Sequence, residues 1–413
     1  MAYPIPYGSW LTARRLRIHG LILLVCLWSV YIWNMATPGL RDRGGNLKGT
    51  DFVHLYTLGS VALAHRGPDL YDMNAQAEIT AQRVPAATGI RYIPLYPPQV
   101  SVFFAPLAAL PYASVLIGWL VFSAVIYGIC CYAFWKACPN LHRDGWTVLI
   151  LAAAFPGFFH LITWGQTSAL ALACFTLAFF SLRKERAFLT GLALGCLIFK
   201  PQLGLATAIV FAATGAWKVV AGGALSAGAQ LAVAWLYYGA ESLRQWIRIL
   251  LPVAYTMPTL EPKPYQTHSL PTFWTMLVPR LDLAFGLYML SAGVVLGLTI
   301  ATWRDRRSDL GLRYSSLLLS TVLIAPHLTV YDLVILAPAF FLLADWVVGH
   351  PLNTSMGGLG FLLYFAYFSP LLGPLALWTH FQVSVVLIAV LVYMIWQLAR
   401  RMDPSSAVKS CAV

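Results

Sequence analysis

The sequence predicts an all-α integral membrane protein that crosses the bilayer many times. Of its 413 residues, 59% are hydrophobic and only 10% are charged, whereas a soluble domain carries about 25% charged residues. A soluble fold of this length cannot bury so much apolar side chain, and long apolar stretches recur along the chain. We therefore expect a single polytopic membrane domain over residues 1–413.

About twelve apolar stretches are predicted to span the membrane. A span needs roughly 20 apolar residues to cross about 30 Å of hydrocarbon. The fifth and sixth stretches are shorter than this, so we expect them to be half-buried or to border a water-filled cavity. The still shorter segment 99–110 is expected to lie in the interface or to re-enter the membrane. The expected spans are 18–36, 112–135, 146–163, 166–182, 187–199, 202–217, 219–238, 283–303, 311–326, 330–347, 356–373 and 378–399.

Basic residues predict the orientation. Lys and Arg in short loops near span ends mark the cytoplasmic side, and with twelve spans the basic clusters all fall on one side. Both termini are then cytoplasmic in a plasma (inner) membrane, with the tail 402–413 disordered, and the long loops 37–111 and 239–282 lie outside. The basic residues of these clusters are Arg14, Arg15, Arg17, Lys136, Arg143, Arg183, Lys184, Arg186, Lys218, Arg304, Arg306, Arg307, Arg313, Arg400, Arg401 and Lys409.

The net charge of +12 is mostly this orientation signal. The basic residues are scattered, and no basic stripe interleaves with aromatic residues as in a nucleic-acid-binding surface. We therefore expect no nucleic-acid partner.

The first outer loop is predicted to contain two amphipathic helices on the membrane surface. Apolar residues recur at helical spacing from Phe52 to Ala62, and Gly67-Pro68 ends that pattern. A second helix is expected from Asp72 to Val84, before Pro85. Helices with one apolar face lie in the interface plane.

Polar residues from distant segments are predicted to meet on the outer side. Each lies in an outer loop, in an outer turn between two spans, or at the outer end of a span, so polar groups from separate segments are predicted to share one depth on one face. The candidate site residues are Asp51, His54, Gln166, Lys200, Gln202, His327, Tyr331 and Asp332, and Gln266 and His268 lie in the second outer loop.

Asp51 has two interpretations. An Asp that precedes a helix is a favoured N-cap. A carboxylate at the mouth of a lipid-embedded bundle can instead act as a general base that takes a proton from an attacking hydroxyl. His54, one turn later, could orient that carboxylate, or it could be a surface histidine of the helix.

Lys200 interrupts a hydrophobic run, so it is interpreted either as a phosphate-binding point charge or as a lysine that snorkels to the headgroups. His327, Tyr331 and Asp332 are expected on one broad helix face, where His327 could contact phosphate. Asp332 needs a partner, either Lys200 or His327, and the alternative is a purely structural buried pair. Gln166 and Gln202 point to a cavity or cap short turns.

Motifs of soluble enzymes are absent from the sequence. There is no Gly-rich phosphate loop, no HExxH and no G-x-S-x-G. We expect no metal and no cofactor, and the absence of an Asp-x-Asp pair argues against a metal-dependent nucleotide-sugar enzyme.

The order and spacing of several motifs resemble glycosyltransferase family 87 over roughly residues 45–345. They are Asp51 after the first span, GPDLYD at 67–72, YPP at 96–98, PLAALP at 106–111, WGQ at 164–166, FKPQ at 199–202 and APHLTVYD at 325–332.

The resemblance implies a GT-C-type membrane bundle and a sugar donor carried on a polyprenyl phosphate, as in the α-mannosyltransferases of the family. It implies an outward-facing, metal-independent site with Asp51 as the catalytic base and His327 near the donor phosphate. Such an enzyme transfers a hexose, with inversion, to a lipid or glycan acceptor. Mannosyltransferases of the group are expected to carry a Trp-His pair where this chain has Pro326-His327, which leaves the donor sugar open.

A transporter or flippase of a lipid-linked sugar is the alternative. Such a protein is expected to have inverted repeats and polar residues at the bilayer midplane. The sequence shows no repeat, and its polar residues are predicted to gather outside, so the pattern favours a transferase.

Overall fold

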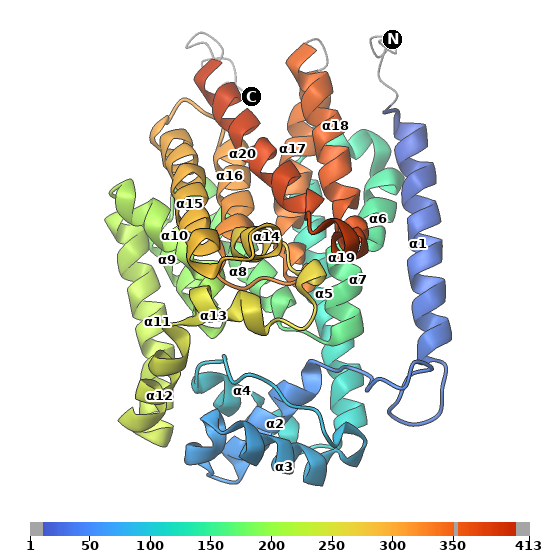
Figure 1. Cartoon of the computed structure of the whole chain (residues 1–413). Coiled ribbons are helices and arrows are strands. Elements are labelled where there is room, and N and C mark those ends of the chain that lie inside the picture. Colours follow the sequence, from blue (N-terminus) through green and yellow to red (C-terminus); the bar gives the residue numbers. More distant parts are fainter. Residues whose placement is uncertain (1–10, 351–353, 402–413) are drawn as a thin grey trace.

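The computed structural model describes residues 11–350 and 354–401, and its described part is mostly helical (Figure 1). Within these residues the backbone forms no β-strand, and extended pairing is limited to two isolated bridges. The expectation of an all-α membrane protein is therefore confirmed. The expected cytoplasmic tail 402–413 lies outside the described residues.

Seven helices or helix runs in the described residues are long and apolar enough to cross a membrane. Two of them include 3-10 turns: η6 (Val330–Leu336) continues into α17 (Ala337–Gly349), and α18 (Thr354–Phe368) continues through η7 (Ser369–Leu375) into α19 (Ala376–Thr379). The other five are α1 (Ala13–Met35), α5 (Tyr112–Ala137), α11 (Trp217–Tyr238), α15 (Leu281–Arg304) and α20 (Val383–Arg401).

The remaining expected spans are short helices, so the count of about twelve full spans is not confirmed. The expected span at 146–163 is broken before Pro156, where the chain bends by 42°. A proline has no amide hydrogen and disfavours a helical residue before it. These short helices are α6 (Gly145–Ala154, preceded by η3, Pro139–Asp144), α7 (Pro156–Trp164), α8 (Ser168–Arg183), α9 (Ala187–Gly195, followed by η4, Cys196–Phe199), α10 (Pro201–Ala213) and α16 (Leu310–Ile324).

The first long loop folds into a helical cluster with its own apolar core. Every residue from Phe52 to Ala62 is buried. The first expected amphipathic helix therefore has no exposed polar face, because α3 (Met73–Arg83) and α4 (Gln99–Ala108) pack against it. The second helix lies where the sequence predicts it and is capped by Asp72. The elements are α2 (Phe52–Leu63), η1 (Gly67–Tyr71), α3 (Met73–Arg83), η2 (Pro85–Ala87) and α4 (Gln99–Ala108).

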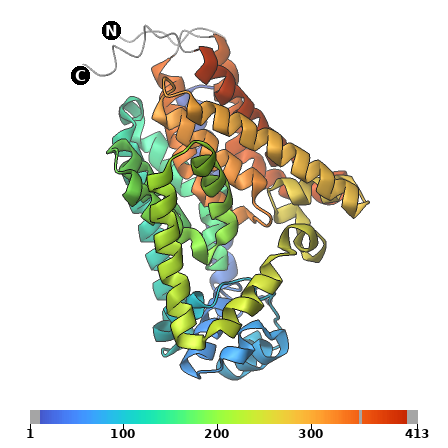
Figure 2. The ribbon, with the colours of Figure 1, turned by 90° about the vertical axis from the view of Figure 1, so that its left-hand side faces the viewer.

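The second long loop is also largely helical. Its segments run beside the helical cluster of the first loop and then along the bundle (Figure 2), and the indole nitrogen of Trp246 donates a hydrogen bond to the carbonyl of Leu95 at 3.2 Å. The elements are α12 (Ala240–Leu250), α13 (Val253–Leu260), η5 (Pro264–Gln266) and α14 (Leu270–Leu277).

The start of α1 and the end of α20 lie at one end of the bundle, and the α2–α4 cluster lies at the other (Figures 1 and 2). Arg17, near the start of α1, pairs with Asp144 at 2.9 Å. The loop between α5 and α6 is therefore at the same end as the start of α1, as the distribution of basic residues predicts. The long first loop is at the opposite end.

Close packing of α2 on α4 can be tested at Gly59. A Cβ at this position would lie 2.4 Å from the carbonyl oxygen of Phe104, whereas a Cβ at Gly118 would meet no atom within 4 Å. We expect Gly59→Ala to force the two helices apart and to cost about 1–3 kcal/mol. The matched Gly118→Ala should leave the thermal unfolding midpoint of the purified protein unchanged or higher. Equal midpoints for the two variants would contradict this packing.

Candidate active site

A tight turn brings the α7–α8 junction against the start of α2. Helix α7 ends at Trp164, and Gly165 adopts a left-handed conformation with φ of +72°. A Cβ at Gly165 would lie 2.8 Å from the Cβ of Phe52, so both the conformation and the contact require glycine. The backbone N–H of Asp51 donates to the carbonyl of Trp164 at 3.1 Å. The turn that the sequence predicts at 164–166 therefore places Gln166 beside Asp51.

The carboxylate of Asp51 does not cap α2. Asp51 has helical backbone angles, and its side chain accepts no capping hydrogen bond. Its Oδ2 instead accepts a hydrogen bond from Nε2 of Gln166 at 2.5 Å. Asp72 behaves differently, because its carboxylate accepts from the backbone amides at the start of α3. Of the two interpretations of Asp51, the N-cap is therefore wrong, and the carboxylate remains available for chemistry.

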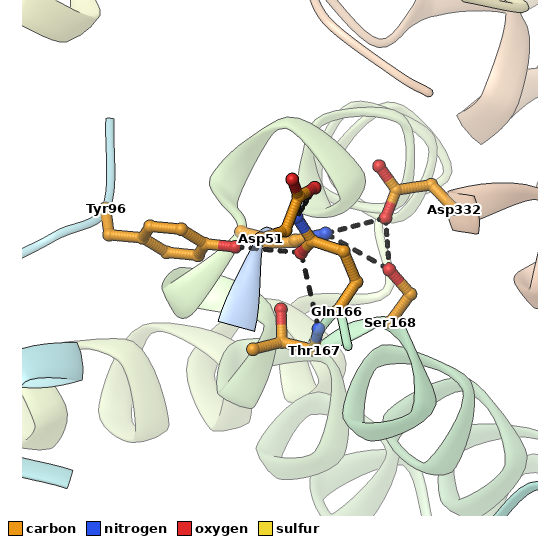
Figure 3. A network of polar contacts seen from close by, with 7 residues as sticks. Asp51, Tyr96, Gln166, Thr167, Ser168 and Asp332 are labelled. Carbon is orange, nitrogen blue, oxygen red and sulfur yellow. Dashed lines mark hydrogen bonds and ion pairs between the residues drawn. The ribbon is translucent and has the colours of Figure 1, made fainter. Parts of the chain in front are cut away.

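Gln166 is itself held by two donors (Figure 3). The hydroxyl of Tyr96 donates to its Oε1 at 3.1 Å, and the backbone N–H of Thr167 lies 3.4 Å from the same oxygen. The side chain of Gln166 therefore has a defined geometry, in which one end of the amide binds Tyr96 and the other binds Asp51.

Partial removal of water around Asp51 raises the pKa of its carboxyl group to about 6. The hydrogen bond from Gln166 and the positive charge of Lys200 oppose this rise, and the carboxylates of Glu261 and Asp332 add to it. A carboxyl group with this pKa is mostly ionised at pH 7 but holds a proton far better than an ordinary aspartate, which suits a general base.

Lys200 and Asp332 form a buried ion pair next to Asp51. Nζ of Lys200 lies 2.7 Å from Oδ1 of Asp332, and their side chains are only 5% and 2% exposed. Ser168 donates to the same carboxylate oxygen at 2.5 Å and accepts from Lys200 at 3.1 Å. The ring of Tyr331 lies 4.9 Å from the ammonium. Of the two partners considered for Asp332, Lys200 is therefore the one it pairs with, and the snorkelling interpretation of Lys200 is wrong.

His327 lies near this pair but not on a helix. Residues 325–329 are irregular, and Thr329 forms an isolated antiparallel bridge with Thr267 of the second loop. The expectation that His327, Tyr331 and Asp332 share a helix face is therefore wrong, because η6 begins only at Val330. Nδ1 of His327 lies 3.7 Å from a carboxylate oxygen of Glu261. Burial lowers the pKa of His327, and Glu261 opposes this change.

The two remaining candidates differ in their surroundings. His54 is buried, stacks on Tyr92 with ring centroids 4.6 Å apart and meets Tyr96 edge-on at 5.6 Å. The surface-histidine interpretation is therefore wrong, and burial lowers the pKa of His54 to about 4. Gln202 is half-buried at the start of α10, and in the described part of the chain its side chain forms no hydrogen bond that would assign it a role.

Sequence reasoning missed four residues of this region. Tyr96 and Ser168 lie within or beside motifs that the sequence analysis names, but a hydroxyl group alone gives no positional signal. Glu261 and Lys263 lie in the Pro-rich second loop, which brings Glu261 to His327 and the ammonium of Lys263 to within 5.4 Å of the ring of Trp164. Their proximity depends on a loop path that the local sequence does not encode.

Among the described residues, no group of three or more His, Cys, Asp and Glu side chains is arranged to hold a metal ion. The chemical groups that do converge are a carboxylate, an amide, a buried ammonium–carboxylate pair and an imidazole. This set can move a proton and can stabilise an anion.

Fold and site together define a polytopic helical membrane protein in which the Asp51 carboxylate lies beside a buried cation. The family model of glycosyltransferase family 87 matches residues 95–326, more than half of the chain. The chain therefore belongs to glycosyltransferase family 87 and is a membrane glycosyltransferase. The match includes Gln166 and Lys200, begins after Asp51 and ends one residue before His327. Comparisons with curated proteins and with solved structures gave no match.

The ion pair predicts an asymmetric response to mutation. Asp332→Asn leaves the Lys200 ammonium buried without its counter-charge, so we expect a loss of about 3–5 kcal/mol of stability. The double variant Lys200→Met/Asp332→Leu should recover most of that loss, because it removes both charges.

Thermal unfolding of the purified variants measures this effect. The matched control is Asp305→Asn, which breaks a pair with Arg307 whose side chains are 19% and 61% exposed, and exposed pairs contribute about 0–1 kcal/mol. If Asp332→Asn is no more destabilising than Asp305→Asn, the pair is not buried as described.

Proposed function

We propose that this protein transfers a hexose from a polyprenyl-phosphate donor to a lipid or glycan acceptor, with inversion at the anomeric carbon. The observation that carries the proposal is the position of the Asp51 carboxylate. It makes no capping hydrogen bond to α2, and Gln166 holds it next to a buried cation. The family to which the chain belongs supports sugar transfer as the reaction.

In the proposed reaction, Asp51 removes the proton from the acceptor hydroxyl as that oxygen attacks the anomeric carbon. The new bond joins the acceptor oxygen to the sugar, and the bond from the sugar to the phosphate oxygen breaks. The electron pair leaves with the polyprenyl phosphate. A carboxylate that binds a proton with a pKa near the working pH is an effective base.

The leaving phosphate needs positive charge or hydrogen-bond donors. An ammonium group has three N–H donors, and Lys200 uses two of them on Ser168 and Asp332. In this proposal the third donor and the imidazole of His327 face the phosphate. Lys263, which is exposed and forms no ion pair among the described residues, adds charge from the second loop. The ring of Tyr331 contacts the Lys200 ammonium. In this proposal Gln202 and His54 lie close to the bound substrate.

The sidedness of the site is part of the proposal. The start of α1 and the end of α20 lie at one end of the bundle, opposite the α2–α4 cluster, which begins directly after Asp51 (Figure 1). If the basic end is cytoplasmic, the Asp51 region faces the outer side of the plasma membrane, where a lipid-linked donor is presented.

Asp51→Asn tests the base directly. We expect turnover of decaprenyl-phosphate-[14C]mannose or decaprenyl-phosphate-[14C]glucose, with a membrane lipid extract as acceptor, to fall by at least about 10²–10⁴-fold. The matched control is Asp72→Asn, because Asp72 also precedes a helix but caps it, and asparagine caps equally well.

Asp72→Asn should therefore retain activity and stability. Full activity in Asp51→Asn would remove the base assignment. Movement of the intact donor across vesicle membranes without sugar transfer would instead support a flippase.

The pH dependence follows from the pKa of Asp51. The base must be deprotonated to accept the hydroxyl proton, so kcat should rise with pH through a midpoint of about 6 and level off above it. A profile of kcat against pH with wild-type protein in lipid nanodiscs measures this midpoint. A rate that is constant from pH 5 to pH 8 would contradict a carboxyl base with this raised pKa.

A further inference from the structure

The orientation of the Gln166 amide is determined by its neighbours. The oxygen and nitrogen of an amide side chain are distinguished by their hydrogen-bond partners. Oε1 of Gln166 faces the Thr167 backbone N–H at 3.4 Å, a group that can only donate, and the Tyr96 hydroxyl at 3.1 Å, which donates to it in this orientation. Nε2 must then face Asp51, where it donates to Oδ2 at 2.5 Å. The opposite orientation would place the amide oxygen against a carboxylate oxygen.

We propose that Tyr96 and Gln166 form a positioning pair that orients Asp51 for proton abstraction. Gln166 occupies Oδ2, and Oδ1 accepts no hydrogen bond from the described residues, so Oδ1 is the atom that takes the acceptor's proton. Among the described residues the Tyr96 hydroxyl makes no hydrogen bond to Asp51, and it acts through Gln166. This inference rests on the proposed function of Asp51 as the base.

Tyr96 is well placed to hold Gln166 because its own segment is fixed. The Tyr71 hydroxyl donates to the carbonyl of Tyr96 at 3.2 Å, and Trp246 donates to the carbonyl of Leu95. The ring of His54 meets the Tyr96 ring edge-on. Since backbone and ring are both restrained, the hydroxyl is presented to Gln166 in one position, and the pair is preorganised before substrate binds.

The electrostatic surroundings determine the direction of the effect. The charged groups that act on Asp51 are Lys200, Glu261 and Asp332, and Asp51 in turn acts electrostatically on Tyr92, Tyr96, Tyr112 and Tyr331. The donor of Gln166 stabilises the ionised carboxylate, so its loss raises the pKa of Asp51. Loss of the Tyr96 hydroxyl frees the Gln166 amide to rotate, so it should also raise the pKa of Asp51.

The experiment compares Gln166→Met, Tyr96→Phe and the double variant. Infrared spectroscopy of protein in lipid nanodiscs follows the C=O stretch of protonated Asp51 against pH, and the band is identified by its absence in Asp51→Asn. The matched controls are Gln230→Met on α11 and Tyr127→Phe on α5, whose side chains each donate a hydrogen bond, to a backbone carbonyl, but lie outside the site. Turnover with the labelled polyprenyl-phosphate donors gives kcat and KM for each variant.

We expect Gln166→Met to move the Asp51 titration upward by about one pH unit and Tyr96→Phe to move it in the same direction. The double variant should match Gln166→Met, because Tyr96 acts through the glutamine. The acid limb of the kcat profile should move in parallel, with KM little changed, and both controls should titrate like wild type.

An unchanged titration in Tyr96→Phe, or shifts that add in the double variant, would overturn the positioning pair. The proposed function fails separately, if the Asp51→Asn variant still transfers sugar. The two tests are independent because the infrared titration requires no substrate.

Discussion

The buried ion pair between Lys200 and Asp332 is the constraint on which the site depends. An unpaired charge in an apolar bundle is very costly, so the start of α10 and the start of η6 must meet, and Ser168 at the start of α8 completes the contact. Three segments that are far apart in sequence are thereby fixed at one level of the bundle. The positive charge of Lys200 also lowers the pKa of Asp51, so the structural ion pair influences the candidate base.

Asp51 lies where the α2–α4 cluster meets the membrane bundle. The cluster has an apolar core built from residues between Leu47 and Trp119, and the bundle has a separate one. Gly165 allows the α7–α8 turn to reach the first core, and the Trp119 indole donates to its carbonyl at 3.0 Å. A carboxylate at such a junction is shielded from bulk water, and this burial is what raises the pKa of Asp51.

Much of the site was predictable because its parts are local. The turns around Gly165 and Lys200 follow from a helix-breaking glycine and proline, and the need of Asp332 for a cationic partner follows from its place in an apolar run. The number of full spans was not predictable, since several apolar stretches form helices too short to cross the membrane, and one breaks before Pro156. The helix expected around His327 fails because Thr329 pairs with Thr267 of the second loop.

The sequence by itself determined the class of protein, its helical membrane character and the residue types of the site, because composition and local spacing control burial and turns. Only the tertiary structure decided what each polar group does. Asp51 is a plausible helix cap by sequence, and it becomes a free, oriented carboxylate only because Gln166, 115 positions away, is brought to it. Which partner a polar side chain finds depends on long-range packing, and no local pattern specifies it.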